Sequence, residues 1–349
     1  MKKFVRLAVL ICLFGLGFAQ PAMKAAAEPY LDNETLHSNQ DPNTETRRSD
    51  HFRLAFGHYN RDTGTPMTEQ LAQGNLQMFE RMWNRWVVEM GMHDLNESAT
   101  QPDGNKYRAN FVFLMTWNDG GGGGAYMSMD GNGFCWAMAN TGYCRYDPPS
   151  GATPHEMGHV WEGTAGGFNG SDSSGAWWEC TANWMQLQFL NTYPTAQNYV
   201  ANAMYYPAHG RDFYDSWAIW EAARDDPRYG GYWVNKVWTD ANASQRVNEF
   251  ILDRMIRVDT SGSLDKAGAV KDLWGDMAQK CVTWDFERQQ WLKADSKADD
   301  GSDWEFYRKN RTPLVKEPGA AGWYRPGHQF RNLPMLDYAG FGHDGLTHG

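Results

Sequence analysis

The chain has 349 residues, and its 42 acidic side chains outnumber the 32 basic ones, which gives a formal net charge of −10. Nucleic acids and anionic membranes are poor partners for so acidic a surface, whereas basic polypeptides are suitable ones. The length is sufficient for a sizeable core, either in one large domain or in two subdomains around a cleft.

The first 27 residues have the pattern of a secretory signal peptide. Lys2, Lys3 and Arg6 precede an apolar run over residues 7–18, and three alanines stand directly before Glu28. This run is shorter than the roughly 20 apolar residues that cross a bilayer, and no later stretch reaches that length. We therefore expect an exported protein with no membrane anchor, extracellular rather than periplasmic.

The remaining chain divides into three parts by composition. Residues 28–49 are polar, and we expect them to be poorly ordered. Residues 50–290 are predicted to form the main domain, with a cleft near residues 150–185. Residues 291–349 are rich in proline, glycine and aromatic side chains, and we expect either a tail or a small subdomain there.

The first half of the main domain has both strand and helix patterns. Weak alternation predicts a strand over residues 51–56, and apolar periodicity predicts a long amphipathic helix over residues 68–90. Thr68 is a typical N-cap, and Gly91 is a typical helix end. Residues 107–117 have apolar side chains on both faces, which favours a central strand.

Residues 119–140 lead into the next helix. Five consecutive glycines lack the Lys-Ser/Thr ending of a phosphate loop, and we expect them to form a flexible rim over a cleft. The pattern of residues 125–140 then predicts a strand or a hairpin.

Residues 155–159 read His-Glu-Met-Gly-His, the H-E-x-x-H signature of zinc hydrolases. On a helix that begins at residue 153 or 154, His155 and His159 leave the same face one turn apart. Their two nitrogens can then hold one Zn²⁺ at about 2.0–2.1 Å, and Glu156 can reach a water on the same metal. Because a chance match is the alternative, the surrounding residues must decide.

A third ligand is needed, and Glu179 is the candidate. Glu162 and Ala165 occupy the glycine and final histidine positions of the metzincin motif, so that class is excluded. In thermolysin-like gluzincins the third ligand is a glutamate on a following helix. Glu179 stands 20 residues after His159, beyond a stretch rich in turn-forming residues at 163–175. The pattern predicts helix, loop and second helix, with zinc between the helices.

Two further polar residues are candidates for a supporting role. Glu162 lies on the same helical face as both histidines, but ligands spaced at 0, 4 and 7 on one helix cannot easily surround a small ion. We therefore expect it beside a ligand or on the helix surface. Asn183, four residues after Glu179, could accept an N–H from a ligating histidine. An ordinary polar helix residue is an equal alternative.

Beyond Asn183 the chain is predicted to be mainly helical, over residues 183–190, 213–223, 246–257 and 267–284. The predicted fold is therefore α+β and gluzincin-like. It has a small N-terminal sheet packed on the long helix, then the active-site helix and a mainly helical C-terminal half.

Four cysteines remain after export. An even number in an oxidising compartment suggests two disulfides, for which three pairings exist. A bond between Cys135 and Cys144 would close a short loop and leave Cys180 to pair with Cys281. Cysteine ligation of zinc is the weaker alternative, since no C-x-x-C spacing occurs.

Several stretches together resemble one secreted bacterial family. They are Ser-Asp-His-Phe-Arg-Leu at 49–54, Asn-Arg-Trp-Val-Val-Glu at 84–89, the motif at 155–159 and Trp-Trp-Glu at 177–179. Residues 45–290 are similar to the Svx/AvrXca-type avirulence proteins of plant-pathogenic bacteria, which are gluzincin-like metallopeptidases. This resemblance implies an extracellular peptidase acting on host or plant cell-wall proteins. In the gluzincin layout, an edge strand before the active-site helix can receive an extended peptide.

The expected chemistry is zinc-assisted hydrolysis of peptide bonds. Zn²⁺ lowers the pKa of its water toward about 7 and polarises the scissile carbonyl, while Glu156 transfers the proton to the leaving amine. His209 is our candidate donor to the oxyanion, with Tyr206 or Tyr214 behind it. A surface loop residue is the alternative for His209.

The expected partner is a polypeptide, such as a basic or proline-rich cell-wall protein, and we expect a monomer. The 17 tryptophans and 16 tyrosines suggest a different class, a carbohydrate- or cell-wall-binding effector with a non-catalytic or structural zinc site. Glu156 favours the peptidase, because a structural zinc site needs no carboxylate beside the metal.

Overall fold

The structure is a computed structural model that describes most of the chain between residues 43 and 287. The described residues are 30–32, 43–60, 63–99, 103–117, 124–166, 176–190, 217–240, 251–283, 286–287, 314–316 and 324–326. Strands and helices both occur in them, as the predicted α+β class requires.

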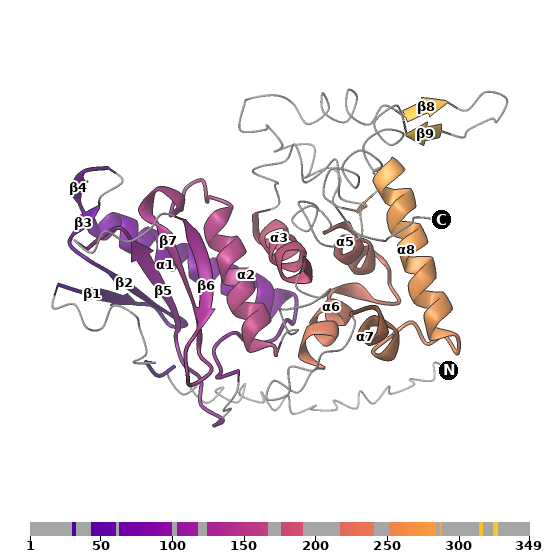
Figure 1. Ribbon diagram of the computed structural model, residues 1–349, viewed down its shortest axis with the longest axis horizontal. Coiled ribbons are helices and arrows are strands. Elements are labelled where there is room, and N and C mark those ends of the chain that lie inside the picture. Colours follow the sequence, from indigo (N-terminus) through magenta and orange to yellow (C-terminus); the bar gives the residue numbers. More distant parts are fainter. Residues whose placement is uncertain are drawn as a thin grey trace, which may run out of the picture.

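A five-stranded mixed sheet forms the N-terminal half (Figure 1). Its order is β1 (Glu45–Arg48), β2 (Phe52–Phe56), β5 (Ala109–Leu114), β7 (Cys135–Asn140) and β6 (Ala125–Met129). The strands β2, β5 and β7 run parallel, and β1 and β6 pair antiparallel at the two edges. Residues 107–117 were expected to contain a central strand, and β5 lies in the middle of the sheet.

The helices occupy the space beside the sheet and beyond it. In Figure 1, α2 lies between the sheet and α3, and α5 to α8 gather on the other side of α3. Their bounds are α1 (Glu69–Trp83), α2 (Ala152–Thr164), α3 (Ala176–Leu190), α5 (Ala218–Asp225), α6 (Gly230–Thr239), α7 (Ile251–Arg257) and α8 (Lys266–Thr283). None of the described helices is both long enough and apolar enough to cross a bilayer.

The helix predicted over residues 68–90 is present as α1 and a π-helical continuation, η1 (Asn84–Glu89). The Thr68 hydroxyl accepts a hydrogen bond from the Leu71 N–H at 3.2 Å, so the predicted N-cap is confirmed. Gly91 has a φ of +67°, a left-handed conformation that ends a helix at little cost for glycine.

One cluster of buried apolar side chains runs from the sheet into the helical half. Its largest fully buried members include eight tryptophans: Trp86, Trp161, Trp177, Trp184, Trp217, Trp220, Trp233 and Trp238. Several contact each other edge to face, as in the Trp177–Trp220 pair with ring centroids 5.2 Å apart. These indoles are core side chains, and so they cannot stack on a sugar at the surface.

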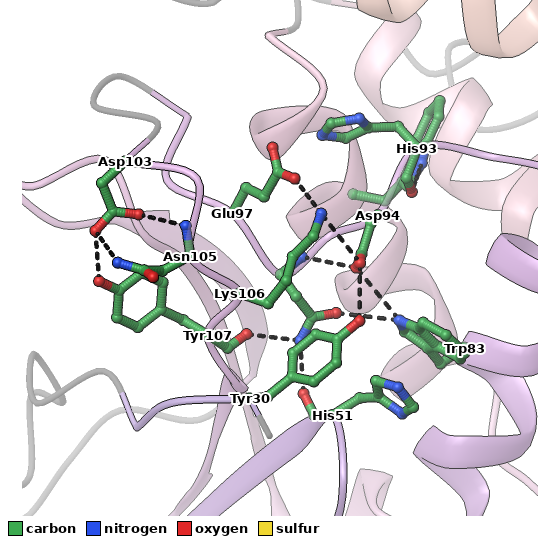
Figure 2. Close-up of polar contacts among 12 residues, drawn as sticks. Tyr30, His51, Trp83, His93, Asp94, Glu97, Asp103, Asn105, Lys106 and Tyr107 are labelled. Atoms are coloured by element: carbon green, nitrogen blue, oxygen red, sulfur yellow. Dashed lines mark hydrogen bonds and ion pairs between the residues drawn. The ribbon is translucent and has the colours of Figure 1, made fainter. Parts of the chain in front are cut away.

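Residues 30–32 and 43–48 are held against or within the sheet, in contrast to the expected disorder of residues 28–49. Tyr30 donates a hydrogen bond to Asp94 at 3.0 Å (Figure 2). Leu31 forms a parallel bridge with Tyr107. Residues 45–48 form β1. The prediction is therefore wrong for residues 30–32 and 43–48, because hydrogen bonds and ion pairs, rather than apolar periodicity, hold these polar residues.

The predicted disulfides are absent from the described cysteines. Cys135, Cys144 and Cys180 are buried thiols. Cys135 begins β7, whereas the Cys144 thiol lies 3.2 Å from the Asn140 carbonyl at the other end of that strand. A six-residue strand spans about 17 Å, far beyond the roughly 4.4–6.8 Å between the Cα atoms of a disulfide. Cys180 contacts the Trp177 carbonyl at 3.5 Å, and the Cys281 side chain lies outside the described residues.

Some elements were not predicted from the sequence. The helix α6 and the hairpin of β3 (Tyr59–Asn60) with β4 (Thr65–Pro66) are present in the structure. In the segment 291–349, the described residues form a small hairpin of β8 (Leu314–Lys316) with β9 (Tyr324–Pro326).

Candidate metal centre

The proposed metal ligands lie at a close contact between α2 and α3. A Cβ placed on Gly158 would lie 3.0 Å from the Cα of Ala182, so even a methyl group would force one of the two backbones to shift slightly. Gly158 stands between His155 and His159 on α2, and Ala182 follows Glu179 by three residues on α3. The missing side chain therefore lets the two helices approach until the three candidate ligands meet.

The ligating atoms of His155, His159 and Glu179 all lie within 4.8 Å of one another. Glu179 Oε2 is 3.0 Å from His155 Nε2 and 3.3 Å from His159 Nε2. The three residues that the spacing singled out are thus brought together, and the site offers two imidazole nitrogens and one carboxylate oxygen.

The other nitrogen of each ring has its own acceptor. His155 Nδ1 lies 2.7 Å from Asn183 Oδ1, and His159 Nδ1 lies 2.7 Å from Glu162 Oε2. Asn183 therefore contacts a candidate ligand, which is the first of its two alternatives, and Glu162 lies beside a ligand, fully buried, rather than on the helix surface. Such partners fix the ring orientation and the tautomer of a metal-binding histidine.

The tautomers follow from these partners. An amide oxygen only accepts, so His155 Nδ1 carries the shared proton, and Nε2 of the neutral ring is left with a lone pair. When Glu162 is ionised, Nδ1 of His159 likewise carries the shared proton, and Nε2 of its neutral ring has the lone pair. Two nitrogen lone pairs and a carboxylate oxygen then converge on one point. This is the donor set of a catalytic His₂Glu zinc site, so the residues fit the metal that the motif implies.

The pKa values of the three candidate ligands are shifted in different directions. Burial lowers the pKa of His155, but the hydrogen bond and the charge of Glu179 outweigh it and hold that pKa above its ordinary value. For His159 burial dominates, and its pKa is lowered. Burial opposes ionisation of Glu179, yet its contacts with both histidines, which donate from Nε2 when their rings are protonated, bring its pKa far below the ordinary value. Glu179 is therefore ionised across the physiological range.

Two further glutamates lie in this buried region. Burial raises the pKa of Glu156 to about 7; the charge of His155 lowers it and that of Glu179 raises it. Burial, and then the charge of Glu179, raise the pKa of Glu162 well above its ordinary value. Glu156 is thus a carboxyl group that can accept or release a proton near neutral pH.

A buried network on α5 holds α3 in place. Glu221 Oε2 accepts hydrogen bonds from Trp184 Nε1 at 3.0 Å and from Gln188 Nε2 at 2.8 Å. Glu221 is fully buried, so these bonds fix α3 where no water competes. Glu221 was not predicted as a site residue, since a lone glutamate in a helical pattern carries no signal of burial.

Trp178 was also missed as a site residue. Its ring centroid lies 6.4 Å from that of His159. The available signal was its position directly before Glu179. The candidate oxyanion donor His209, together with Tyr206 and Tyr214, lies outside the described residues, as does the glycine segment 119–123.

Residues 29–326 match the model of a family described as "Family of unknown function (DUF6055)". No curated protein matches the chain significantly.

Proposed function

We propose that this chain, which belongs to the family of unknown function DUF6055, is a zinc-dependent endopeptidase. The observation that carries the proposal is the convergence of His155, His159 and Glu179 within 4.8 Å, with Glu156 beside them. Two histidines and a glutamate are the ligands of zinc peptidases such as thermolysin, and they leave a position for water or substrate.

The protein's own residues supply the rest of the chemistry. Zinc, when bound, supplies a Lewis acid toward the scissile carbonyl and makes water more acidic. Glu156 accepts the proton of the attacking water at its carboxylate and returns it to the leaving amine. Asn183 and Glu162 hold the two imidazoles in the orientation that presents Nε2 to the metal.

The sheet edge supports a polypeptide as the substrate. β6 ends the sheet, and its residues are partly or largely exposed. Met127 of this strand lies next to α2, since a Cβ on Gly163 would be 3.3 Å from its Cε. The opposite edge, β1, carries the ion pairs of Arg47 with Glu45 and Glu69, whereas the sequence of β6 has no charged side chain. An uncharged edge strand suits the addition of an extended peptide.

The setting of the reaction is part of the same proposal. The signal-peptide pattern favours export, and the net charge of −10 favours basic substrates. With the resemblance to Svx/AvrXca-type proteins, these features support an extracellular enzyme acting on host or plant cell-wall proteins, including basic or proline-rich ones.

Exposed aromatic side chains favour a second candidate function. Tyr126, Tyr143 and Tyr232 are 47%, 48% and 62% exposed, and tyrosines on a surface can stack on sugars. In that case the chain would be a carbohydrate- or cell-wall-binding effector with a structural zinc site.

Zinc content and proteolysis, measured for the wild type and Glu156→Gln, test the proposal. The substrates are a mixture of proteins that includes basic and proline-rich chains. We expect one zinc per chain in both proteins and cleavage slower by about 10²–10⁴-fold in the variant. Equal cleavage by both would contradict the role of Glu156. Zinc in both with polysaccharide binding and no cleavage would favour the second candidate.

A further inference from the structure

Near the proposed metal ligands, a few side chains of α2 and α3 keep some exposure. The described residues in the first three turns of α3 are buried except for Trp178 and Glu179. Most polar side chains of α2 are almost completely buried. The most exposed of them are His155, Glu156 and His159, with exposed fractions of 9%, 7% and 8%. Because Glu179 contacts both histidines and Trp178 lies beside His159, these five side chains form one partly accessible cluster.

Trp178 is the large apolar side chain among these five, and packing holds its ring in place. Its indole meets Trp238 edge to face, with centroids 5.3 Å apart and an interplanar angle of 80°. Trp238 is fully buried and packs in turn against Trp161 of α2 at 6.1 Å. The Trp178 ring is thus held by the core, and the residue remains partly exposed beside the ligands.

We propose that Trp178 is a specificity-determining residue, an apolar wall that contacts the substrate side chain next to the scissile bond. An indole that is already ordered and partly desolvated gains most from a large apolar or aromatic side chain. The carboxylates of Glu156 and Glu179 in the same cluster disfavour an acidic side chain there. The substrate class is therefore a polypeptide with a bulky apolar residue at that position, and this inference rests on the proposed function.

The test measures binding, so that it does not depend on turnover. Glu156→Gln, loaded with zinc, is titrated by calorimetry with capped seven-residue peptides that are all glycine except for a central Phe or Ala. We expect the Phe peptide to bind about 10-fold more tightly or better. Adding Trp178→Ala should bring this ratio close to one, and adding Trp178→Phe should retain most of it.

Two controls show whether Trp178 contacts the peptide directly or whether its replacement only disturbs the protein as a whole. Tyr59→Ala removes an exposed aromatic side chain from β3, at the opposite end of the sheet from α3 (Figure 1), and should leave the ratio unchanged. The zinc content of each variant shows whether the metal site has survived. If Trp178→Ala does not fold, Trp178→His keeps a planar ring of polar character and should lose most of the preference.

The inference is overturned if Glu156→Gln binds both peptides equally, or if the ratio survives Trp178→Ala. These outcomes are distinct from failure of the proposed function. Cleavage by the wild type without any preference would leave the peptidase in place and remove the role of Trp178. If the ratio of the two affinities depends on Trp178 but the protein cleaves nothing, Trp178 would remain a peptide-binding residue and the peptidase activity would be contradicted.

Discussion

The two histidines of α2 have acceptors of different charge. His155 is oriented by an amide, Asn183, and His159 by a buried carboxylate, Glu162. The ligand set could be predicted from the sequence because two spacings define it, four residues within one helix and 20 to the next. The sequence could not show which acceptor would bind which histidine ring, because this pairing depends on how the two helices are rotated against each other.

A carboxylate makes an imidazole a stronger ligand than an amide does. We therefore expect Glu162→Gln to weaken zinc binding by about 10- to 100-fold, whereas Asn183→Asp strengthens it. Competition with a chromophoric chelator measures both dissociation constants. Equal zinc affinity in wild type and both variants would show that neither residue acts through its histidine.

The buried side chain of Asp225, away from the candidate metal centre, should make the stability of the protein depend on pH. Its side chain is 1% exposed at the end of α5, and burial raises its pKa from 3.8 to about 6. Over this interval the folded state binds more protons than the unfolded state, so this group's contribution to stability is lost as pH rises toward 6.

The variant Asp225→Asn does not ionise and so escapes this loss. As the pH rises from 4 to 7, the free energy of unfolding of the variant should increase by about 1–3 kcal/mol relative to that of the wild type. Urea unfolding of both proteins at several pH values measures the difference. A difference that stays constant with pH would show that Asp225 has an ordinary pKa.

At the scale of elements, the decisive contact is that between α2 and α3 at Gly158. Both helices were predicted from the sequence, because local periodicity and turn-forming residues define them. The helix α6 was missed: it begins with two glycines and is rich in tryptophan and valine, which also favour strands. Its buried Trp233, Val234, Val237 and Trp238 have helical spacing, so tertiary packing stabilises a weakly helical segment.

Gly158→Ala should push the two helices apart, because the new Cβ meets the Ala182 backbone. We expect a loss of about 1–3 kcal/mol in the free energy of unfolding, together with weaker zinc binding. The matched control is Gly275→Ala in α8, where a Cβ has no atom within 4 Å. That change should stabilise the protein by about 0.5–1 kcal/mol. Similar effects of both changes on unfolding would argue against the close helix contact.

At the scale of the whole molecule, sequence reasoning failed where distant segments meet. The strand β1 has the sequence Glu-Thr-Arg-Arg and no apolar alternation; its pairing with β2 and the bond between Arg47 and Glu69 hold it. The disulfide prediction rested on a count of cysteines, which says nothing about distance. The mixed α+β organisation was predictable, because most of its helices and strands have local patterns.

The thiols lead to a prediction about the whole fold. A disulfide typically contributes about 2–4 kcal/mol, so reduction of one would lower the melting temperature by several degrees. Since Cys135, Cys144 and Cys180 are buried thiols, we expect a reducing agent to leave the melting temperature unchanged. The same three thiols should react with a thiol reagent only after unfolding. A clear fall on reduction would show that disulfides form after all.

The central claim is that one zinc ion binds between α2 and α3, and anomalous diffraction at the zinc edge from crystals of the zinc-loaded protein tests it most directly. We predict one strong peak at about 2.0–2.2 Å from His155 Nε2, His159 Nε2 and a carboxylate oxygen of Glu179. A zinc-saturated crystal with no peak between these three side chains would contradict the metal site and, with it, the proposed peptidase.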